Sequence, residues 1–182
     1  GSVVPRIPAN ELTSELSNVV VYLDAPAGAI AALDTARTRV MSQSEERFEP
    51  HVLPIRAGER VEFPNYDDLY HNVFSLSRVR TFDLGRYPRG ASKSVAFQKP
   101  GVVQVYCHIH ADMSAIVLVL ANDFFARPDT AGDYAIENVP PGEYTITGWH
   151  ERTRPVTRRI RVTAGQTTVV DFKLPLGVSP ES

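Results

Sequence analysis

Short apolar segments that end at turn residues recur along the chain. Clear examples are residues 18–24, 61–65 and 114–120, which are rich in Val, Leu, Ile or Phe. Fourteen prolines and eleven glycines punctuate the sequence between such segments. Short segments rich in β-branched and aromatic residues are typical of strands rather than helices. The pattern therefore predicts an all-β protein.

Three other stretches carry more specific expectations. Pro50 and Pro54 remove backbone donors from residues 47–56, so we expect this strand at a sheet edge or with a bulge. Residues 77–90 are basic and predict a loop. Periodicity does not decide whether the Ala-rich residues 25–38 form a short helix or a loop.

A strand that begins at residue 102 has alternating side chains. Val103, Val105 and Cys107 share one face of this strand, and Gln104 and Tyr106 share the other. The valines belong in a core. Cys107 is therefore predicted to point inward at the end of the strand.

Length and charge limit the possible classes. A chain of 182 residues with 43% hydrophobic content is long enough for two small domains, which is the organisation that we expect. The net charge of -2 gives no basic footprint for nucleic acid. No apolar run approaches the roughly 18 residues of a membrane span.

The single cysteine excludes an internal disulfide. In an exported protein, a leftover thiol calls for a reason such as metal ligation. Residues 1–2 are typical of a cloning scar, and no signal peptide is present. That start fits a mature exported domain and a cytosolic one equally.

Cys107, His110 and Met113 follow the order Cys-x-x-His-x-x-Met directly after the strand that begins at residue 102. Thiolate, imidazole and a weak axial thioether are the ligand types of a copper electron-transfer site. His71 can supply a second imidazole from upstream. The alternative is a buried core thiol with incidental histidines. Ligand order, spacing and flanking strands together favour copper.

These segments resemble the cupredoxins, the blue-copper family that includes plastocyanin and amicyanin. The short loop from Cys107 to Met113 is most similar to amicyanin, and the His71-Asn72 pair resembles the family's first ligand. The resemblance implies a Greek-key sandwich with one type 1 copper ion per chain, cycling between Cu(I) and Cu(II). It also implies a one-electron carrier, not an enzyme, in the periplasm or another exported compartment, with an unidentified redox partner.

Residues 130–174 resemble a second family, the carboxypeptidase regulatory-like (transthyretin-like) β-sandwich. The motif Val139-Pro-Pro-Gly-Glu-Tyr144 lies within this stretch. We therefore predict a copper domain at residues 28–123 and a small sandwich at residues 124–182. Modules of the second family usually open with a strand like residues 18–24. The N-terminal residues 1–27 would then complete the sandwich, with the copper domain inserted; two domains in series are the alternative.

The cupredoxin resemblance also assigns roles around the ligands. Asn72 would brace the loop that carries Cys107. Amicyanin-like proteins have proline and a large apolar residue beside the exposed histidine, whereas this chain has Ala111 and Asp112. The docking face should therefore be smaller and negatively charged, with charge pairing to fast-exchanging partners.

Several other residues have a functional and a simpler explanation. His108 should face away from Cys107 as a surface residue, with a pH-sensitive or partner-facing group as the alternative. His51 and His150 are interpreted as packing or surface residues, and the alternative is that they lie near the copper or form a second metal site. Asp67 and Asp68 are interpreted as turn-formers. Two arginine groups are interpreted as solvated surface, with steering of an anionic partner as the alternative: Arg78, Arg80, Arg86 and Arg89, and Arg152, Arg154, Arg158, Arg159 and Arg161.

Two other functions remain open at this point. In the first, the site buffers or delivers copper for tolerance, which the extra histidines would serve. In the second, copper keeps an open position for a small ligand, as in an enzyme. Met113 argues against the enzyme because an axial ligand would already fill that position. The sequence does not give the oligomeric state.

Ile109 provides the first testable prediction. Amicyanin and plastocyanin have proline at this place, so Ile109 offers an extra backbone N–H that can reach the Cys107 sulfur. Such a bond stabilises the electron-rich thiolate and favours Cu(I). Ile109→Pro should therefore lower the reduction potential in voltammetry, whereas Ile109→Ala, which keeps the N–H, should not. An unchanged potential in Ile109→Pro contradicts the idea.

Overall fold

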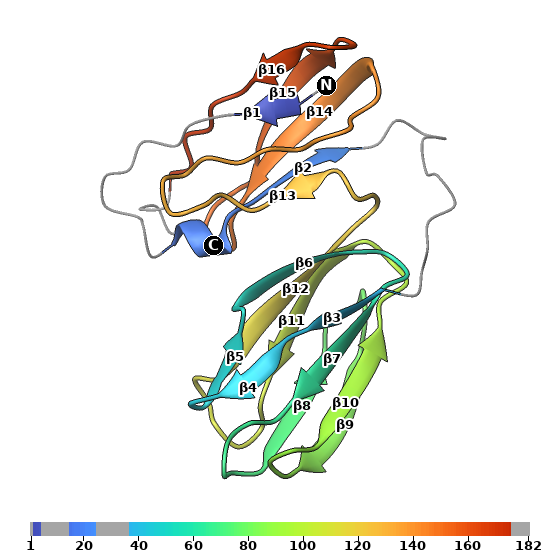
Figure 1. Ribbon diagram of the computed structural model, residues 1–182. Coiled ribbons are helices and arrows are strands. Elements are labelled where there is room, and N and C mark those ends of the chain that lie inside the picture. Colours follow the sequence, from blue (N-terminus) through green and yellow to red (C-terminus); the bar gives the residue numbers. More distant parts are fainter. Residues whose placement is uncertain (1, 5–14, 25–36, 176–182) are drawn as a thin grey trace. The chain divides into compact units, whose positions relative to one another are not determined.

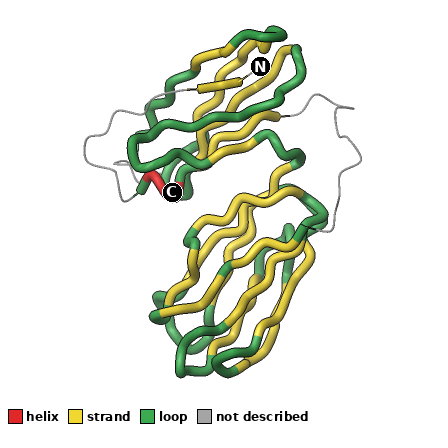
Figure 2. The backbone as a smooth tube through the Cα atoms, in the orientation of Figure 1, coloured by secondary structure: helices red, strands yellow, loops and turns green. Residues whose placement is uncertain are grey.

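The computed structural model describes residues 2–4, 15–24 and 37–175, and these residues are almost entirely strands and loops (Figures 1 and 2). The only helical element among them is a single 3-10 turn, η1 (Leu16–Asn18). The prediction of an all-β protein is confirmed. Within the described residues, no helix has the length and apolarity needed to cross a membrane. Most of the undecided Ala-rich stretch, residues 25–36, lies outside the described part.

The chain divides into two compact units, residues 31–123 and residues 1–30 together with 124–182. The first unit is a β-sandwich. One sheet has the order β6-β12-β11-β8-β9, and the other has the order β10-β7-β3. Most connections cross between these sheets, as in a Greek key. The strands are β3 (Thr38–Val40), β4 (Ser42–Ser44), β5 (Arg47–Glu49), β6 (Val52–Arg56), β7 (Arg60–Pro64), β8 (His71–Ser75), β9 (Phe82–Tyr87), β10 (Ser92–Ala96), β11 (Gly101–Tyr106) and β12 (Ser114–Leu120).

Alternation along β11 builds the core of this unit. Val103 and Val105 are fully buried and Cys107 is 6% exposed, whereas Tyr106 is exposed. The predicted inward direction of Cys107 is confirmed. The valines pack in one cluster with Phe63 and Phe97, and Cys107 and Met113 belong to the same cluster. The candidate ligands therefore lie at one end of a packed core.

Two local expectations need revision. Residues 47–56 form two strands, β5 and β6, because the chain breaks at Pro50 and His51. Pro54 does lie in an edge strand, since β6 pairs only with β12 in its sheet. The loop expected at residues 77–90 was wrong in part, because it contains strand β9, which pairs with β8. Half-buried Phe82 and Leu84 alternate in this strand with exposed Asp83 and Gly85, and the arginines of the surrounding stretch concealed this short alternation.

The second unit is also built from strands. Its main sheet has the order β13-β2-β14-β15, and β1 pairs in parallel with β16. The N-terminal strand β2 lies antiparallel to β14, with Asp24 opposite Thr145 and Val20 opposite Trp149. A separate core of aliphatic and aromatic side chains packs beneath this sheet. The strands are β1 (Ser2–Val4), β2 (Val20–Asp24), β13 (Phe125–Ala126), β14 (Gly142–Trp149), β15 (Val156–Val162) and β16 (Thr167–Val169).

A buried histidine follows β14 in this unit. His150 is fully buried; its Nε2 lies 3.2 Å from Oε2 of Glu15, and its Nδ1 accepts the backbone N–H of Arg152 at 3.1 Å. The proton of the neutral ring is therefore on Nε2. Burial lowers the pKa of His150 and outweighs the opposing effect of the Glu15 carboxylate.

This histidine should make the second unit less stable in acid. Unfolded His150 takes up a proton near the ordinary pKa of about 6.5, whereas the folded protein does so only at lower pH. The contribution of neutral His150 to stability is thus fully present above the ordinary pKa of about 6.5 and is lost as the pH falls toward the lowered pKa of the folded protein. The charged groups around the ring are Glu15, Glu151 and Arg152.

Fluorescence of Trp149, the one tryptophan, reports unfolding of this unit in urea. The free energy of unfolding should fall between pH 7 and pH 5, and His150→Gln should flatten that dependence. His51→Gln, in the other unit, should leave the Trp149 transition unchanged. Equal pH slopes in the native protein and His150→Gln would contradict the prediction.

Candidate metal centre

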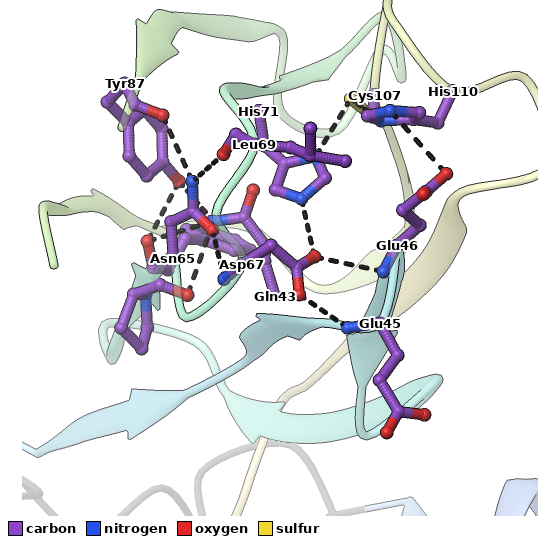
Figure 3. A network of polar contacts seen from close by, with 12 residues as sticks. Gln43, Glu45, Glu46, Asn65, Asp67, Leu69, His71, Tyr87, Cys107 and His110 are labelled. Atoms are coloured by element: carbon purple, nitrogen blue, oxygen red, sulfur yellow. Dashed lines mark hydrogen bonds and ion pairs between the residues drawn. The ribbon is translucent and has the colours of Figure 1, made fainter. Parts of the chain in front are cut away.

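Three donor atoms converge at one end of the first unit. Sγ of Cys107 lies 3.8 Å from Nδ1 of His71 and 3.8 Å from Nδ1 of His110. All three donor atoms lie within 4.8 Å of one another, and Figure 3 shows both rings directed toward the thiol. The rings meet edge to face, with centroids 4.9 Å apart. Residues separated by 36 positions in the sequence thus form one cluster.

The loop between β11 and β12 holds two of these donors. Tyr106 and Ser114 close a ladder of antiparallel pairs at its base. Within the loop, the Cys107 N–H donates to the Met113 carbonyl at 3.1 Å, and the Met113 N–H donates to the His110 carbonyl at 3.1 Å. Met113 is only 1% exposed. The loop is therefore a closed turn whose first and last side chains, Cys107 and Met113, are buried.

His71 is positioned by a carboxylate. Its ring is fully buried at the first residue of β8, and its Nε2 lies 2.7 Å from Oδ2 of Asp67. Burial raises the pKa of the Asp67 carboxyl, but the hydrogen bonds that it accepts, first from the Glu46 N–H and then from the His71 ring, bring this pKa below its ordinary value. An ionised Asp67 requires the proton of the neutral ring on Nε2. The lone pair of Nδ1 is then free for a metal.

Asp67 belongs to the candidate site, and the sequence did not single it out. The Asp67-Asp68 pair was interpreted as two turn-formers, and only Asp68 fits that description fully, with 83% of its side chain exposed beside Arg89. The signal in the sequence was the four-residue spacing from Asp67 to His71. That spacing has no fixed meaning in a loop, because loop geometry is set by contacts elsewhere.

His110 is the more exposed imidazole, with 20% of its side chain accessible. A shallow hollow beside it is lined by Leu69, Tyr70, Arg86 and Ile109. Leu69 and Tyr70 are 46% and 59% exposed. The surface beside His110 therefore includes exposed apolar side chains and one arginine, in addition to the Ala111 and Asp112 that the sequence singled out.

Asn72 does not have the side-chain role that the family resemblance assigned to it. Its amide donates to Oδ1 of Asp83 in β9 at 2.7 Å, and not to the loop that carries Cys107. Its buried Oδ1 has no hydrogen-bond partner among the described residues. The pairing of β8 with β9 explains this contact, because Asn72 and Asp83 lie on these neighbouring strands.

The other histidines lie apart from the cluster. His108 stacks on Phe74 with ring centroids 3.7 Å apart and is exposed, as predicted. Nδ1 of His51 lies 3.1 Å from the Ser114 carbonyl, and His150 belongs to the second unit. Within residues 2–4, 15–24 and 37–175, the metal-binding group contains none of the three.

The donor set fits a single transition-metal ion. Metal–nitrogen and metal–sulfur bonds of about 2.0 and 2.3 Å at a trigonal angle place the two donors about 3.8 Å apart. The two measured separations between Sγ and Nδ1 are both 3.8 Å. Two imidazoles and a thiolate are three of the ligands of a copper electron-transfer site, and Met113 belongs to the same core cluster as Cys107.

A comparison with family models supports one of the two resemblances. The family described as "Carboxypeptidase regulatory-like domain" matches residues 115–175. This match begins within β12, which belongs to the first unit, and continues through β13, β14 and β15 of the second. A search of curated proteins found no match.

Among solved structures, part of the chain is similar to three proteins. The copper-containing nitrite reductase (NirK) of Thermus scotoductus SA-01 is 27% identical, with 53% of this chain and 25% of that chain covered and a TM-score of 0.44. A purple cupredoxin from Nitrosopumilus maritimus is 22% identical; the match covers 46% of this chain and 98% of the cupredoxin, with a TM-score of 0.41. A mutant of amicyanin in its reduced state is 20% identical; the match covers 55% of this chain and 98% of amicyanin, with a TM-score of 0.43. The matched part spans a quarter of the nitrite reductase.

Proposed function

We propose that this protein is a one-electron carrier with a mononuclear type 1 copper site. The ligands in this proposal are His71, Cys107, His110 and Met113. The observation that carries it is the convergence of one sulfur and two Nδ1 atoms within 4.8 Å at the end of a packed core. Copper would supply the cycling between Cu(I) and Cu(II).

The protein's part is to hold the donors still. His71 belongs to a paired strand, and Cys107 and His110 belong to a closed turn. His71, Cys107 and Met113 are each at least 94% buried, so the donors sit in a dry, packed environment. A site built on rigid strands changes little between oxidation states, and small rearrangement is what fast electron exchange requires.

His110 is the proposed exit for the electron. It is the exposed edge of the cluster, and the apolar side chains of Leu69, Tyr70 and Ile109 surround it. A redox partner could bring its own cofactor close to this ring over a small contact area. Transient contacts of this kind are typical of redox pairs. The partner itself is not identified by these residues.

The domain organisation and compartment complete the proposal. Residues 28–123 would form the copper domain, inserted between an N-terminal strand and a sandwich at residues 124–182; the pairing of β2 with β14 supports insertion over two domains in series. The second unit would serve as scaffold or docking surface. A lone cysteine reserved for a metal is in keeping with an exported compartment such as the periplasm.

Carriage is favoured over the two rival functions by the side chains around the cluster. Copper buffering would use additional ligands, and His51, His108 and His150 do not join the metal-binding group found among the described residues. Catalysis would need an open coordination position, and the buried Met113 lies in the core cluster that contains Cys107. We therefore propose a carrier and not an enzyme.

The spectrum of the copper-loaded protein tests the proposed function. We expect an intense thiolate-to-copper band, a narrow copper hyperfine splitting and reversible one-electron voltammetry. Cys107→Ser should abolish the band, and His108→Ala should keep it. A weak spectrum typical of nitrogen and oxygen ligands contradicts the copper site. Loss of copper to a chelating acceptor, without reversible voltammetry, would favour buffering.

Met113 can be tested separately, because the chain has only two methionines. Met113→Leu removes the thioether while nearly conserving volume, so it should cost less than about 1.5 kcal/mol of stability. The reduction potential should rise, since the oxidised ion loses a donor. Met41→Leu makes the same change at a fully buried core position and should leave the potential unaltered. Equal potentials in both variants would exclude Met113 as a ligand.

A further inference from the structure

Each imidazole of the cluster has a carboxylate at its outer nitrogen. Both carboxylates are connected to the turn between β4 and β5, because Asp67 accepts hydrogen bonds from its backbone and Glu46 belongs to it. Nε2 of His71 faces Asp67 at 2.7 Å, and Nε2 of His110 faces Glu46 at 3.6 Å. We propose that Asp67 is a positioning residue that fixes the His71 ring and biases the site toward oxidised copper. This inference rests on the proposed copper function and deepens it.

The turn between β4 and β5 immobilises Asp67. The backbone N–H of Glu45 donates to Oδ1 of Asp67 at 2.7 Å, and that of Glu46 donates to Oδ2 at 3.0 Å (Figure 3). Both glutamates have left-handed backbone conformations, with φ of 53° and 56°. Such conformations are uncommon outside glycine and cost energy. Here they direct two successive N–H groups at one carboxylate.

Further hydrogen bonds tie the loop that carries Asp67 to the same hairpin and to the core. The Tyr66 N–H donates to the Gln43 carbonyl at 2.9 Å, and the Asp67 N–H donates to Oδ1 of Asn65 at 2.9 Å. The Asn65 amide in turn donates to the carbonyls of Leu69 and Tyr87 at 2.8 and 3.2 Å. Asp67 therefore has little freedom to turn away from His71.

The fixed charge has a chemical consequence at the other side of the ring. A carboxylate that accepts the Nε2 proton increases electron density on the imidazole and makes Nδ1 a stronger donor. A stronger donor and a nearby negative charge stabilise Cu(II) more than Cu(I). Asp67 should therefore lower the reduction potential and tighten copper binding.

Glu46 should contribute less than Asp67. Its side chain is 55% exposed and its oxygen lies 3.6 Å from the ring of His110, whereas Asp67 is 14% exposed and lies 2.7 Å from His71. Solvent screens exposed pairs strongly. The two contacts thus differ in strength although they involve the same turn.

Asp68 is a matched control for Asp67. It is the next residue and carries the same charge, but its carboxylate is 83% exposed and pairs with Arg89. Asp67→Asn should raise the reduction potential and weaken copper binding by about 10- to 100-fold, as is typical for partners of metal-binding histidines. Asp68→Asn should remain near the native values, and Glu46→Gln should change them less than Asp67→Asn does. Equal potentials and affinities in Asp67→Asn and Asp68→Asn would overturn the inference.

A measurement on the native protein covers the case in which Asp67→Asn fails to fold. The nuclear magnetic resonance spectrum of metal-free native protein should show a slowly exchanging Nε2–H of His71, shifted to low field by its hydrogen bond to a carboxylate. Absence of that proton, or its presence on Nδ1, overturns the inference. The result does not depend on copper, so it is separable from the proposed function, which fails if the loaded protein lacks the thiolate-to-copper band.

Discussion

The candidate site depends on the pairing of β8 with β11. Tyr106 at the end of β11 lies opposite Phe74 in β8. Because these strands are antiparallel, the start of β8 comes beside the loop that follows β11. His71 thereby meets Cys107, although the two residues lie 36 positions apart. A shift of one residue in this register would turn His71 to the opposite face of the sheet and separate the donors.

Burying an imidazole next to a thiol requires polar compensation, and the loop before β8 provides it. The ring of His71 is fully buried, and the contact of its Nε2 with Asp67 leaves no unpaired ring N–H. Asp67 is satisfied in turn by two backbone N–H groups from the turn between β4 and β5. One chain of hydrogen bonds therefore fixes a tautomer, a ring orientation and the position of a hairpin. Satisfied hydrogen bonds among buried polar groups make this part of the site rigid.

The two units show how a continuous sequence can form interleaved structures. Strand β2 pairs with β14, more than one hundred positions later, and the sandwich around Cys107 is formed by residues between them. The sequence raised insertion and a serial arrangement as alternatives, because apolar patterns give the existence of a strand without its partner. Partner choice depends on which edges remain unpaired after each sheet has formed.

Local patterns determined the all-β class, the inward direction of Cys107 and its closeness to His110, because these features depend on neighbours a few residues apart. Strand β9 escaped detection because its apolar alternation covers only Phe82 and Leu84 before Gly85, within a stretch rich in arginine. Asp67 and the apolar surroundings of His110 were decided only in the tertiary structure. The contact of Asp67 with His71 and the surroundings of His110 both form where loops from distant parts of the chain meet. Contacts between distant loops produce no periodic pattern in the sequence, so they cannot be predicted from it.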